Sequence, residues 1–482
     1  MENSYLEDRK QIINEMQAIR YGQMKITAND IKATNSLDLS QENAFKDFPD
    51  DFYFSLAMKY KSLIEKHPFF QKLNELPKGA LLHHHMLSAI DPEWFLSLLD
   101  DPCVYEIQAN FDGKSFDKLI YNKAAKGLIS LAQKKGEFLK SQNFESKSDG
   151  ETAFRAEIKK KLGFLPEEVE KIKNNDKIWD VFLPKYFYGK DLVQYKENYK
   201  QHILNVFNQC INDKLLRLET RVIFGQIRNE NFEIIPLDEE MEIYQNCLKK
   251  FRETAPYFSL GMIVEVIRNM TDEVIRKKVR EAYSLKKKYP ELIVGFDFDG
   301  NENKFRSFYE LSHLIIDLRR EYEKEFEVKL PLILHCGESL KYTNQNPIDG
   351  CLLDAKRLGH GINVLKFPYL LEIIKKKNIC IEINPISNQT LKNTLDLRWH
   401  PGIIYFGMGI KIAISNDDPT LYGTKGINYD LFVATAAFEL NLLDLKKIFL
   451  NSIECSTLET KDRDEAIDLF LKNWDEVISN MI

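Results

Sequence analysis

Short apolar segments of strand length alternate with amphipathic helical stretches along most of this chain. Eight such segments occur, at residues 80–85, 215–224, 259–267, 292–298, 330–335, 355–359, 379–384 and 410–415. Strands that alternate with helices favour right-handed βαβ units and a parallel sheet. Because eight units close a (β/α)8 barrel, also called a TIM barrel, we predict this α/β fold. The periodicity by itself also allows a doubly wound open sheet.

The regions outside this alternation indicate the domain organisation. Residues 1–75 carry helical patterns and precede a Pro-Lys-Gly turn signal, which predicts an N-terminal helical extension that could serve as a dimerisation arm. Residues 76–482 make up the predicted barrel domain. The lysine- and glutamate-rich segment at about 100–180 is predicted as an insertion after the first strand, with its own helices and a mobile loop. A pair of solvated helices packed on the barrel is an equally good alternative.

Charge and cysteine content exclude several classes of function. The 67 lysines and arginines against 73 acidic residues give a net charge of −6, which argues against a nucleic-acid partner. The seven cysteines lie far apart without a CxxC motif, so neither a disulfide framework nor a cysteine zinc site is expected. The first residues are polar and acidic, and no run approaches the about 18 apolar residues of a membrane span. We therefore expect a cytoplasmic protein with reduced thiols and no membrane partner.

Three of only nine histidines are consecutive, at the end of the first predicted strand. Side chains alternate along a strand, so His83 and His85 share one face while His84 lies on the other. Two imidazoles on one face supply half a metal site. His84 is predicted to be a bystander.

Three further groups of polar residues follow predicted strands. His335 ends the fifth strand and is followed by Gly337 and Glu338, His360 lies between two glycines after the sixth, and the pair Asp417-Asp418 follows the eighth. Each motif alone is weak, since an acid pair before proline is usually a turn or a helix cap. In a barrel, however, all these strand ends converge on one mouth.

The combined residues predict a metal-activated hydrolase. Three histidines and an aspartate suit zinc or a similar divalent ion with an open position for water. Glu338, His360 and Asp418 would then serve as acid, base and binding groups around it. Cys336 is an alternative soft ligand, but strand alternation directs its side chain away from the face of His335. No phosphate-binding GxGxxG or GxxxxGK loop follows any predicted strand.

Several strings of the sequence resemble the adenosine deaminase superfamily, in particular its adenosine deaminase growth factor (adenosine deaminase 2) branch. They occur in the right order over nearly the whole chain: LPKGALLHHH, LETR, VGFDFDGNE, LHCGES, RLGHG, IEINPISNQTL, DLRWHP, ISNDDPTLYGTKG and NSIECSTLE. The resemblance is weakest at about 100–200. It implies a (β/α)8 barrel that hydrolytically deaminates a purine nucleoside, and a homodimer formed through the N-terminal helices.

The resemblance also implies roles for individual residues, with one Zn2+ per chain. The metal ligands would be His83, His85, His335 and Asp417, the last also counted as catalytic. Glu338 matches the acid that protonates purine N1, and His360 matches the histidine that orients the attacking oxygen and assists proton transfer. Asp418 matches the acid that hydrogen-bonds N7. Gly300 matches the glycine that faces N3, and Gly337 of the HCGE string is also predicted to bind substrate.

Three positions depart from the pattern of that branch. Met86 stands where the branch has an aspartate that hydrogen-bonds the ribose. An approximate alignment also places Leu183 and Ile267 where the branch has a glutamate and a histidine near the sugar. A pocket without polar sugar contacts favours substrates without the corresponding hydroxyls. We therefore predict an aminopurine with an apolar sugar end, such as 5'-methylthioadenosine, or one with an altered ribose. Alternatively, other residues bind the ribose.

Two functions of other kinds stay open at this point. One is a growth-factor-like binding protein that keeps the barrel without turnover, although such a protein would not need Glu338 or His360. The other is an amidohydrolase acting on a non-purine amide or ester, but no lysine is placed for the carboxylated lysine of the usual two-metal site.

Overall fold

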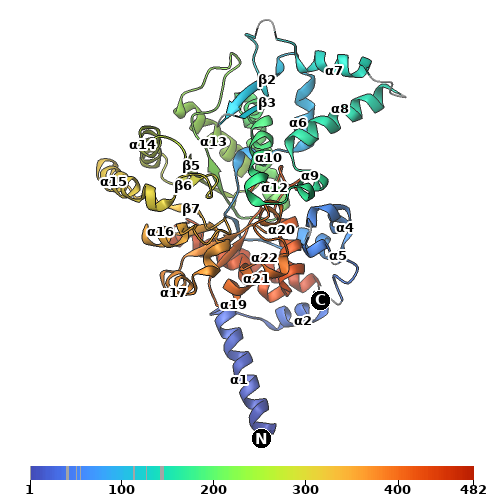
Figure 1. The fold of residues 1–482 in the computed structure, drawn as a ribbon. Helices are drawn as coiled ribbons and strands as arrows, with labels where there is room; N and C mark the ends of the chain where they lie inside the picture. Colours follow the sequence, from blue (N-terminus) through green and yellow to red (C-terminus); the bar gives the residue numbers. More distant parts are fainter. Residues whose placement is uncertain are drawn as a thin grey trace.

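Eight parallel strands organise the chain (Figure 1). The computed structural model describes residues 2–39, 43–49, 51–54, 56–111, 114–125, 128–141 and 146–481. One four-stranded sheet has the order β1 (Ala80–Leu81), β4 (Arg217–Val222), β5 (Ser259–Ile267), β6 (Ile293–Asp299). The other has the order β10 (Ile412–Ile414), β9 (Cys380–Ile383), β8 (Arg357–His360), β7 (Ile333–Cys336). The predicted α/β fold with parallel strands is confirmed.

The two sheets meet at both of their edges through isolated parallel bridges. Phe296 pairs with Leu332 between β6 and β7, and His84 pairs with Asp417 between the segments that follow β1 and β10. The strands therefore follow one another in the order of a (β/α)8 barrel. β1 is shorter than predicted, because beyond Leu81 the backbone forms single hydrogen bonds with Asp417 instead of a continuous ladder.

The helices between the strands show why these segments are helical. In α14 (Asp272–Lys288) the Thr271 hydroxyl accepts a hydrogen bond from the Val274 amide, and lysines fill the last turn where they complement the helix dipole. Its buried residues Ile275, Val279 and Ala282 form one apolar stripe toward the strands. The other helices of the barrel region are α12 (Lys196–Asn212), α13 (Leu237–Arg252), α15 (Phe308–Phe326), α16 (Asn346–Leu352), α17 (Pro368–Lys377), α18 (Pro385–Thr390), α19 (Gly402–Gly407), α20 (Asn428–Phe438), α21 (Leu442–Glu454) and α22 (Thr460–Met481).

The strands carry charged residues in their buried interior as well as apolar ones. Arg221 of β4 is fully buried and forms 2.8 Å ion pairs with Asp297 of β6 and Glu382 of β9. Arg357 of β8 pairs with Glu219 at 2.7 Å and also contacts Glu382. Buried charges of this kind are retained only when they are paired, as they are here.

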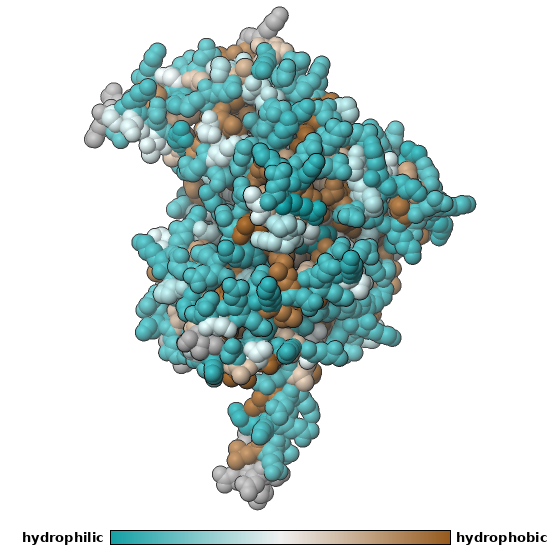
Figure 2. All heavy atoms as spheres, turned by 180° about the vertical axis from the view of Figure 1, so that it is seen from behind, coloured by the Kyte–Doolittle hydropathy of each residue, from teal (hydrophilic) through white to brown (hydrophobic). Residues whose placement is uncertain are grey.

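The N-terminal segment consists of α1 (Glu2–Tyr21), α2 (Ala28–Ser36), α3 (Asp51–Phe54), α4 (Lys61–Lys66) and α5 (Pro68–Glu75). Helix α1 projects from the body, with apolar side chains visible along it (Figure 2). Ile12 and Met16 on this helix are about 60% exposed. At its base Arg20 forms a 3.0 Å ion pair with Asp444 of α21. The domain boundaries and the dimerisation role of this segment stay predictions.

The predicted insertion contains a hairpin that the sequence analysis did not predict. Its antiparallel strands are β2 (Val104–Phe111) and β3 (Lys114–Tyr121). The helices of this region are α6 (Pro92–Ser97), α7 (Leu131–Ser141), α8 (Lys147–Leu162), α9 (Pro166–Lys171), α10 (Asn175–Tyr188) and α11 (Lys190–Val193). Helices α10 and α11 return to the barrel and cover the cavity described below. Among the described helices, none combines the length and apolarity needed to cross a bilayer.

Candidate active site

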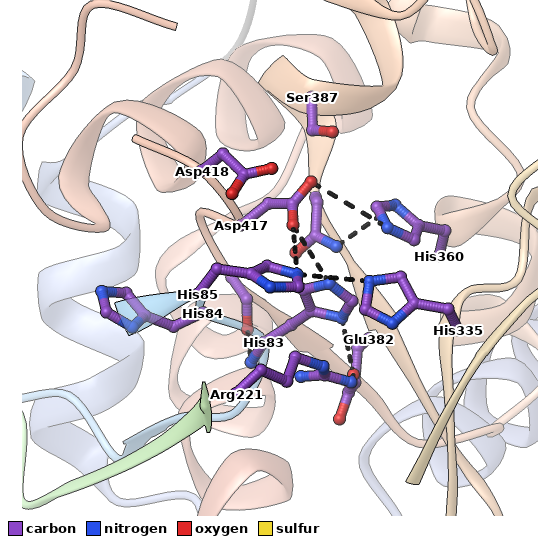
Figure 3. A network of polar contacts seen from close by, with 12 residues as sticks. His83, His84, His85, Arg221, His335, His360, Glu382, Ser387, Asp417 and Asp418 are labelled. Carbon is purple, nitrogen blue, oxygen red and sulfur yellow. Dashed lines mark hydrogen bonds and ion pairs between the residues drawn. The ribbon is translucent and has the colours of Figure 1, made fainter. Parts of the chain in front are cut away.

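The four predicted groups of polar residues lie together at the carboxyl ends of the strands (Figure 3). His83 and His85 follow β1, His335 lies in β7, His360 ends β8, and Asp417 follows β10. All of these residues, and Glu338 and Asp418 beside them, are buried. His84 points the other way and its Nδ1 contacts the Thr220 hydroxyl at 2.8 Å. The Cys336 thiol lies toward Gly350 of α16, on the opposite side of β7 from the histidine cluster.

Three of the four clustered histidines have one ring nitrogen fixed by a carboxylate. The Nδ1–H of His83 donates to Glu382 at 2.7 Å and that of His335 to Asp297 at 2.7 Å. His85 donates in the same way to Glu265 at 3.1 Å. Although burial raises the pKa of Glu382, the charges of Arg221 and Arg357 hold it well below its usual range, so this carboxylate accepts. The Nε2 atoms of these three rings are therefore left with free lone pairs.

These lone pairs face one another and a carboxylate. His85 Nε2 lies 3.3 Å from His335 Nε2, and Asp417 Oδ1 lies 3.2 Å from His83 Nε2 and 3.4 Å from His85 Nε2. His83 Nε2 is buried and has no hydrogen-bond partner. Acceptors at these distances repel one another unless a cation lies among them. Three imidazoles and a carboxylate are the ligands that zinc prefers, and the carboxylates on Nδ1 orient them.

His360 has the opposite tautomer, which a chain of hydrogen bonds determines. The Gly402 amide donates to His400 Nδ1 at 3.0 Å, so His400 carries its proton on Nε2 and donates to Asn388 Oδ1 at 3.0 Å. The Asn388 amide then donates to His360 Nδ1 at 2.9 Å, and Asn384 adds a longer contact of 3.3 Å. His360 therefore carries its proton on Nε2, which lies 3.9 Å from both Glu338 Oε1 and Asp417 Oδ2. Its Nε2 is a donor and cannot serve as a metal ligand, although His360 lies within the same cluster.

Two of the site residues have a backbone conformation that side chains disfavour. His360 has φ +67° and Asp417 has φ +55°, both in the left-handed region. Hydrogen bonds hold Asp417 there, because its amide donates to His83 O and its carbonyl accepts from the His85 amide, both at 3.1 Å. Strain of this kind is typical of functional sites, where the surrounding structure compensates its cost.

The two predicted glycines also need positive φ. Gly300 has φ +113°, and an added Cβ would lie 2.5 Å from the Phe305 ring. Gly337 has φ +78°, and an added Cβ would lie 2.6 Å from Asn363 Oδ1. Any larger residue would clash at either position.

Burial divides the acids of the site into protonated and ionised forms. Burial and then the charge of Asp417 raise the pKa of Glu338 well above its ordinary value, against a lowering by His335. Burial and Asp417 also raise the pKa of Asp418 to about 7. Burial raises the pKa of Asp417, but the polar contacts of its carboxylate with the rings of His83 and His85 hold that pKa well below its ordinary range. Adjacent carboxyls with opposite shifts are suited to different tasks, one as proton donor and one as fixed charge.

A cavity of about 200 Å³ adjoins this cluster and has two chemically different walls. The barrel wall presents His85, His335, Glu338, His360, Asp417 and Asp418. The opposite wall comes from α10 and α11 and presents Trp179, Phe182, Leu183, Tyr186, Phe187 and Lys190. The predicted positions Leu183, Ile267 and Gly300 line the cavity. Met86 and Gly337 are not among the described residues that line it, so the structure does not bring these two to the cavity.

The residues that orient the histidines are not among those predicted from the sequence. Glu265, Asp297, Glu382 and Asn388 received no role, and neither did Asp299, whose Oδ1 lies 3.6 Å from His335 Nε2. A signal was available for three of them, because Glu265, Asp297 and Glu382 are acids inside otherwise apolar strand segments. An acid in such a position must have a partner. For Asn388 no signal exists in the sequence, since its role depends on the path of the loop to His400.

The parallel fold and the cluster at the carboxyl ends of its strands define a metal-dependent hydrolase. The family model described as adenosine deaminase matches residues 156–473. The chain therefore belongs to the adenosine deaminase family and is a hydrolytic deaminase. Zinc is the cofactor of this family, and the three free Nε2 atoms with Asp417 fit it.

Individual relatives agree with this assignment. Adenosine deaminase 2-A of Danio rerio is 27% identical over 443 residues, which cover 89% of this chain and 85% of the relative. Adenosine deaminase 2 of Homo sapiens is 27% identical over 442 residues, covering 90% and 84%. An amidohydrolase structure from Burkhoderia ambifaria with bound Zn matches with a TM-score of 0.58 at 15% identity, covering 86% of this chain and 94% of its own. The predicted resemblance to the adenosine deaminase 2 branch is confirmed.

Proposed function

We propose that this deaminase acts on a 6-aminopurine nucleoside whose sugar end is less polar than the ribose of adenosine, such as 5'-methylthioadenosine. The observation that carries the proposal is the cavity wall formed by α10. Five of its residues face the cavity, namely Trp179, Phe182, Leu183, Tyr186 and Phe187, and none of them is charged. Ile267 and Met270 extend this apolar surface onto the barrel side.

The arrangement of the acids orients the purine. Asp418, with its raised pKa of about 7, is suited to donate a hydrogen bond to N7, and the protonated Glu338 is suited to donate to N1. Both ring nitrogens flank C6, so these two contacts place the amino group against the histidine cluster. N9 lies across the purine from C6, which directs the sugar toward the α10 wall.

The residues of this chain then perform the proton transfers of deamination. His83, His85, His335 and Asp417 would hold the zinc ion, which would supply the Lewis acidity that makes water nucleophilic near neutral pH. His360 donates from Nε2 to the attacking oxygen and orients it toward C6. Glu338 delivers its proton to N1 as C6 becomes tetrahedral, which stabilises the charge that would otherwise develop on the ring. The attacking water gives up both of its protons: one goes to the amino group, which leaves as ammonia, and the other restores the acid form of Glu338. Its oxygen stays on C6 of the 6-oxopurine nucleoside.

Comparison of kcat/KM for adenosine, 2'-deoxyadenosine, 5'-methylthioadenosine and adenine tests the substrate. We expect 5'-methylthioadenosine to exceed adenosine by about tenfold, the discrimination that an apolar pocket achieves for a small apolar group. Leu183→Gln should shift this ratio toward adenosine. Leu395→Gln, at an exposed leucine outside the cavity, is the matched control and should leave it unchanged. A clear preference of the wild-type enzyme for adenosine would refute the proposed sugar specificity.

We also propose that the protein is a homodimer that pairs through α1, because a projecting helix with exposed Ile12 and Met16 leaves apolar surface uncovered. Light scattering during size-exclusion chromatography should give twice the chain mass. Joint substitution of both residues by aspartate should give a monomer. The cytoplasmic location stays a prediction of the sequence.

A further inference from the structure

A largely buried lysine whose ammonium has no hydrogen-bond acceptor among the described residues lies on the apolar wall of the cavity. Lys190 begins α11 and is only 8% exposed. Among the described residues, the contacts of its Nζ are with two aromatic rings, at 5.9 Å from the Tyr186 centroid and 5.1 Å from the Phe187 centroid. Both rings line the cavity together with Lys190 itself. An ammonium group has three donors, and rings satisfy none of them fully.

Lys190 differs in this respect from the other buried lysines nearby. Lys185 on α10 donates to Gly163 O at 2.9 Å and pairs with Glu168 at 2.9 Å. Lys78 below β1 donates to the carbonyls of Leu73 and Leu76. Protein acceptors therefore satisfy the ammonium groups that this fold buries for structural reasons. Lys190 is also the one lysine or arginine among the described residues that line the cavity.

Leaving this ammonium unpaired is unfavourable. Burial lowers the pKa of Lys190, while the charges of Asp191 and Glu265 oppose this shift without forming a close ion pair. The unmet donors face a cavity that is otherwise apolar on that side. A bound molecule that carries negative charge would supply the missing acceptor and restore the charged form of the lysine.

We propose that Lys190 forms a subsite for an anionic group carried on the sugar end of the nucleoside. This inference rests on the proposed function, because the contacts of Asp418 and Glu338 with the purine direct the sugar toward the wall that holds Lys190. It adds to that function a second requirement: the substituent has an apolar part against the α10 rings and a negative charge at Lys190. Phosphate and carboxylate groups can both supply the negative charge, since each offers oxygen acceptors to an ammonium.

The subsite is tested with pairs of substrates that differ in charge. Adenosine is compared with adenosine 5'-monophosphate, and 5'-methylthioadenosine with 5'-(2-carboxyethylthio)-5'-deoxyadenosine, which carries a carboxylate and no ammonium group beyond the same thioether. In the wild-type enzyme we expect kcat/KM for at least one anionic member to exceed that for its neutral partner. Lys190→Met should lower that anionic-to-neutral ratio by ~10- to 100-fold, the effect of losing one charge-assisted hydrogen bond. The pair that responds identifies phosphate or carboxylate as the recognised group.

Two controls separate this loss from general damage. Lys190→Arg keeps the charge and should retain the preference in part. Lys177→Met removes a lysine from the exposed face of α10 and should leave the ratio as it is in the wild type. The neutral substrates report whether each variant is folded and active.

The outcomes distinguish the two proposals. If 5'-methylthioadenosine is preferred to adenosine but no anionic substrate is preferred to its neutral partner, or if Lys190→Met lowers kcat/KM equally for neutral and anionic substrates, the subsite is refuted and the proposed function stands. If the wild-type enzyme deaminates no 6-aminopurine nucleoside, the proposed function is refuted and the subsite with it.

Discussion

Replacing Asn388 with leucine should slow deamination although Asn388 does not line the cavity. The Asn388 amide is fully buried and donates to His360 Nδ1 at 2.9 Å, which keeps the proton of His360 on Nε2. Leucine has a similar volume but cannot donate, so Nδ1 loses its better donor and keeps only the 3.3 Å contact with Asn384. The ring can then adopt the other tautomer, in which Nε2 no longer presents a proton to the attacking oxygen.

The size of the effect follows from the buried hydrogen bond. Leaving a buried acceptor unsatisfied costs about 1–3 kcal/mol, which corresponds to about 5- to 150-fold in rate at 1.36 kcal/mol per tenfold. Because Asn384 remains, we expect a loss near the lower end, about tenfold in kcat, with a smaller change in KM. The loss of absorbance as the 6-aminopurine is converted to the 6-oxo product measures both constants.

A double-mutant cycle shows whether Asn388 acts through His360. His360→Ala should lower kcat by about 10²- to 10⁴-fold, the usual contribution of a proton-transferring group. If the tautomer is the only link, Asn388→Leu in that background should cost less than about twofold. Asn384→Leu, which removes the longer contact, should cost less than Asn388→Leu. Full activity of Asn388→Leu, or losses that simply multiply in the double variant, would contradict this explanation.

Three further predictions concern proton donation, the metal and pH. Glu338→Gln should lower kcat by about 10²- to 10⁴-fold because it removes the proton for N1. The zinc content and Tm of the variant should stay as in the wild type. Undiminished ammonia release would show that another group is the acid. Removing the metal with a chelator should lower Tm, because a cation present at a thousandfold excess over its Kd stabilises the folded state by about 4 kcal/mol. Added Zn2+ should restore the original Tm. Equal Tm values with and without the chelator would argue against a metal among these histidines. Burial raises the pKa of Glu240 to about 7 in the folded protein, outweighing the hydrogen bond from the Gly225 amide. Because folding favours its protonated form, the stability that Glu240 itself contributes should be fully present below pH 4.5 and should fall by about 3 kcal/mol as pH rises to 7. Glu240→Gln should therefore weaken this decline in urea denaturation curves, and an unchanged slope between pH 5 and pH 7 would refute the assignment.

The metal residues could be predicted because their signal is local. His83, His85 and His335 end apolar strands, and the parallel barrel brings such ends together. The orientation of the imidazoles could not be predicted in the same way. It depends on Glu382 and Asp297, which reach the histidines from other strands, and on which ring nitrogen each contacts.

The apolar wall of the cavity could be predicted from the sequence only in part. The alignment suggested Leu183 as a sugar-side residue, and its place in the cavity agrees with this. Met86, adjacent to His85 in the chain, was expected to be the main sugar-side substitution but is fully buried away from the cavity. Its carbonyl accepts a 2.7 Å hydrogen bond from His202, because the chain turns sharply after His85.

The insertion was the least predictable part of the chain. The hairpin of β2 and β3 was missed although the sequence alternates there and contains an Asp-Gly pair, a strong hairpin signal. The high charge of the segment favours helices and a mobile loop over strands. Lys190 could not be recognised from sequence either, because its significance depends on which wall α11 covers.

The guanidinium of Arg221 makes the metal centre sensitive to shear between the two sheets. Asp297, which orients His335, belongs to the sheet of β4, whereas Glu382, which orients His83, belongs to the other sheet. One rigid, planar group therefore spans the gap between two halves of the molecule that share few backbone hydrogen bonds at their edges. Sliding of one half past the other by about an ångström would break one of its 2.8 Å contacts and turn one imidazole relative to the other. The geometry of a metal ion bound by these histidines would therefore depend on the alignment of the two sheets. Substitutions far from the site that loosen this alignment should broaden the absorption spectrum of a cobalt-substituted enzyme before they unfold the protein.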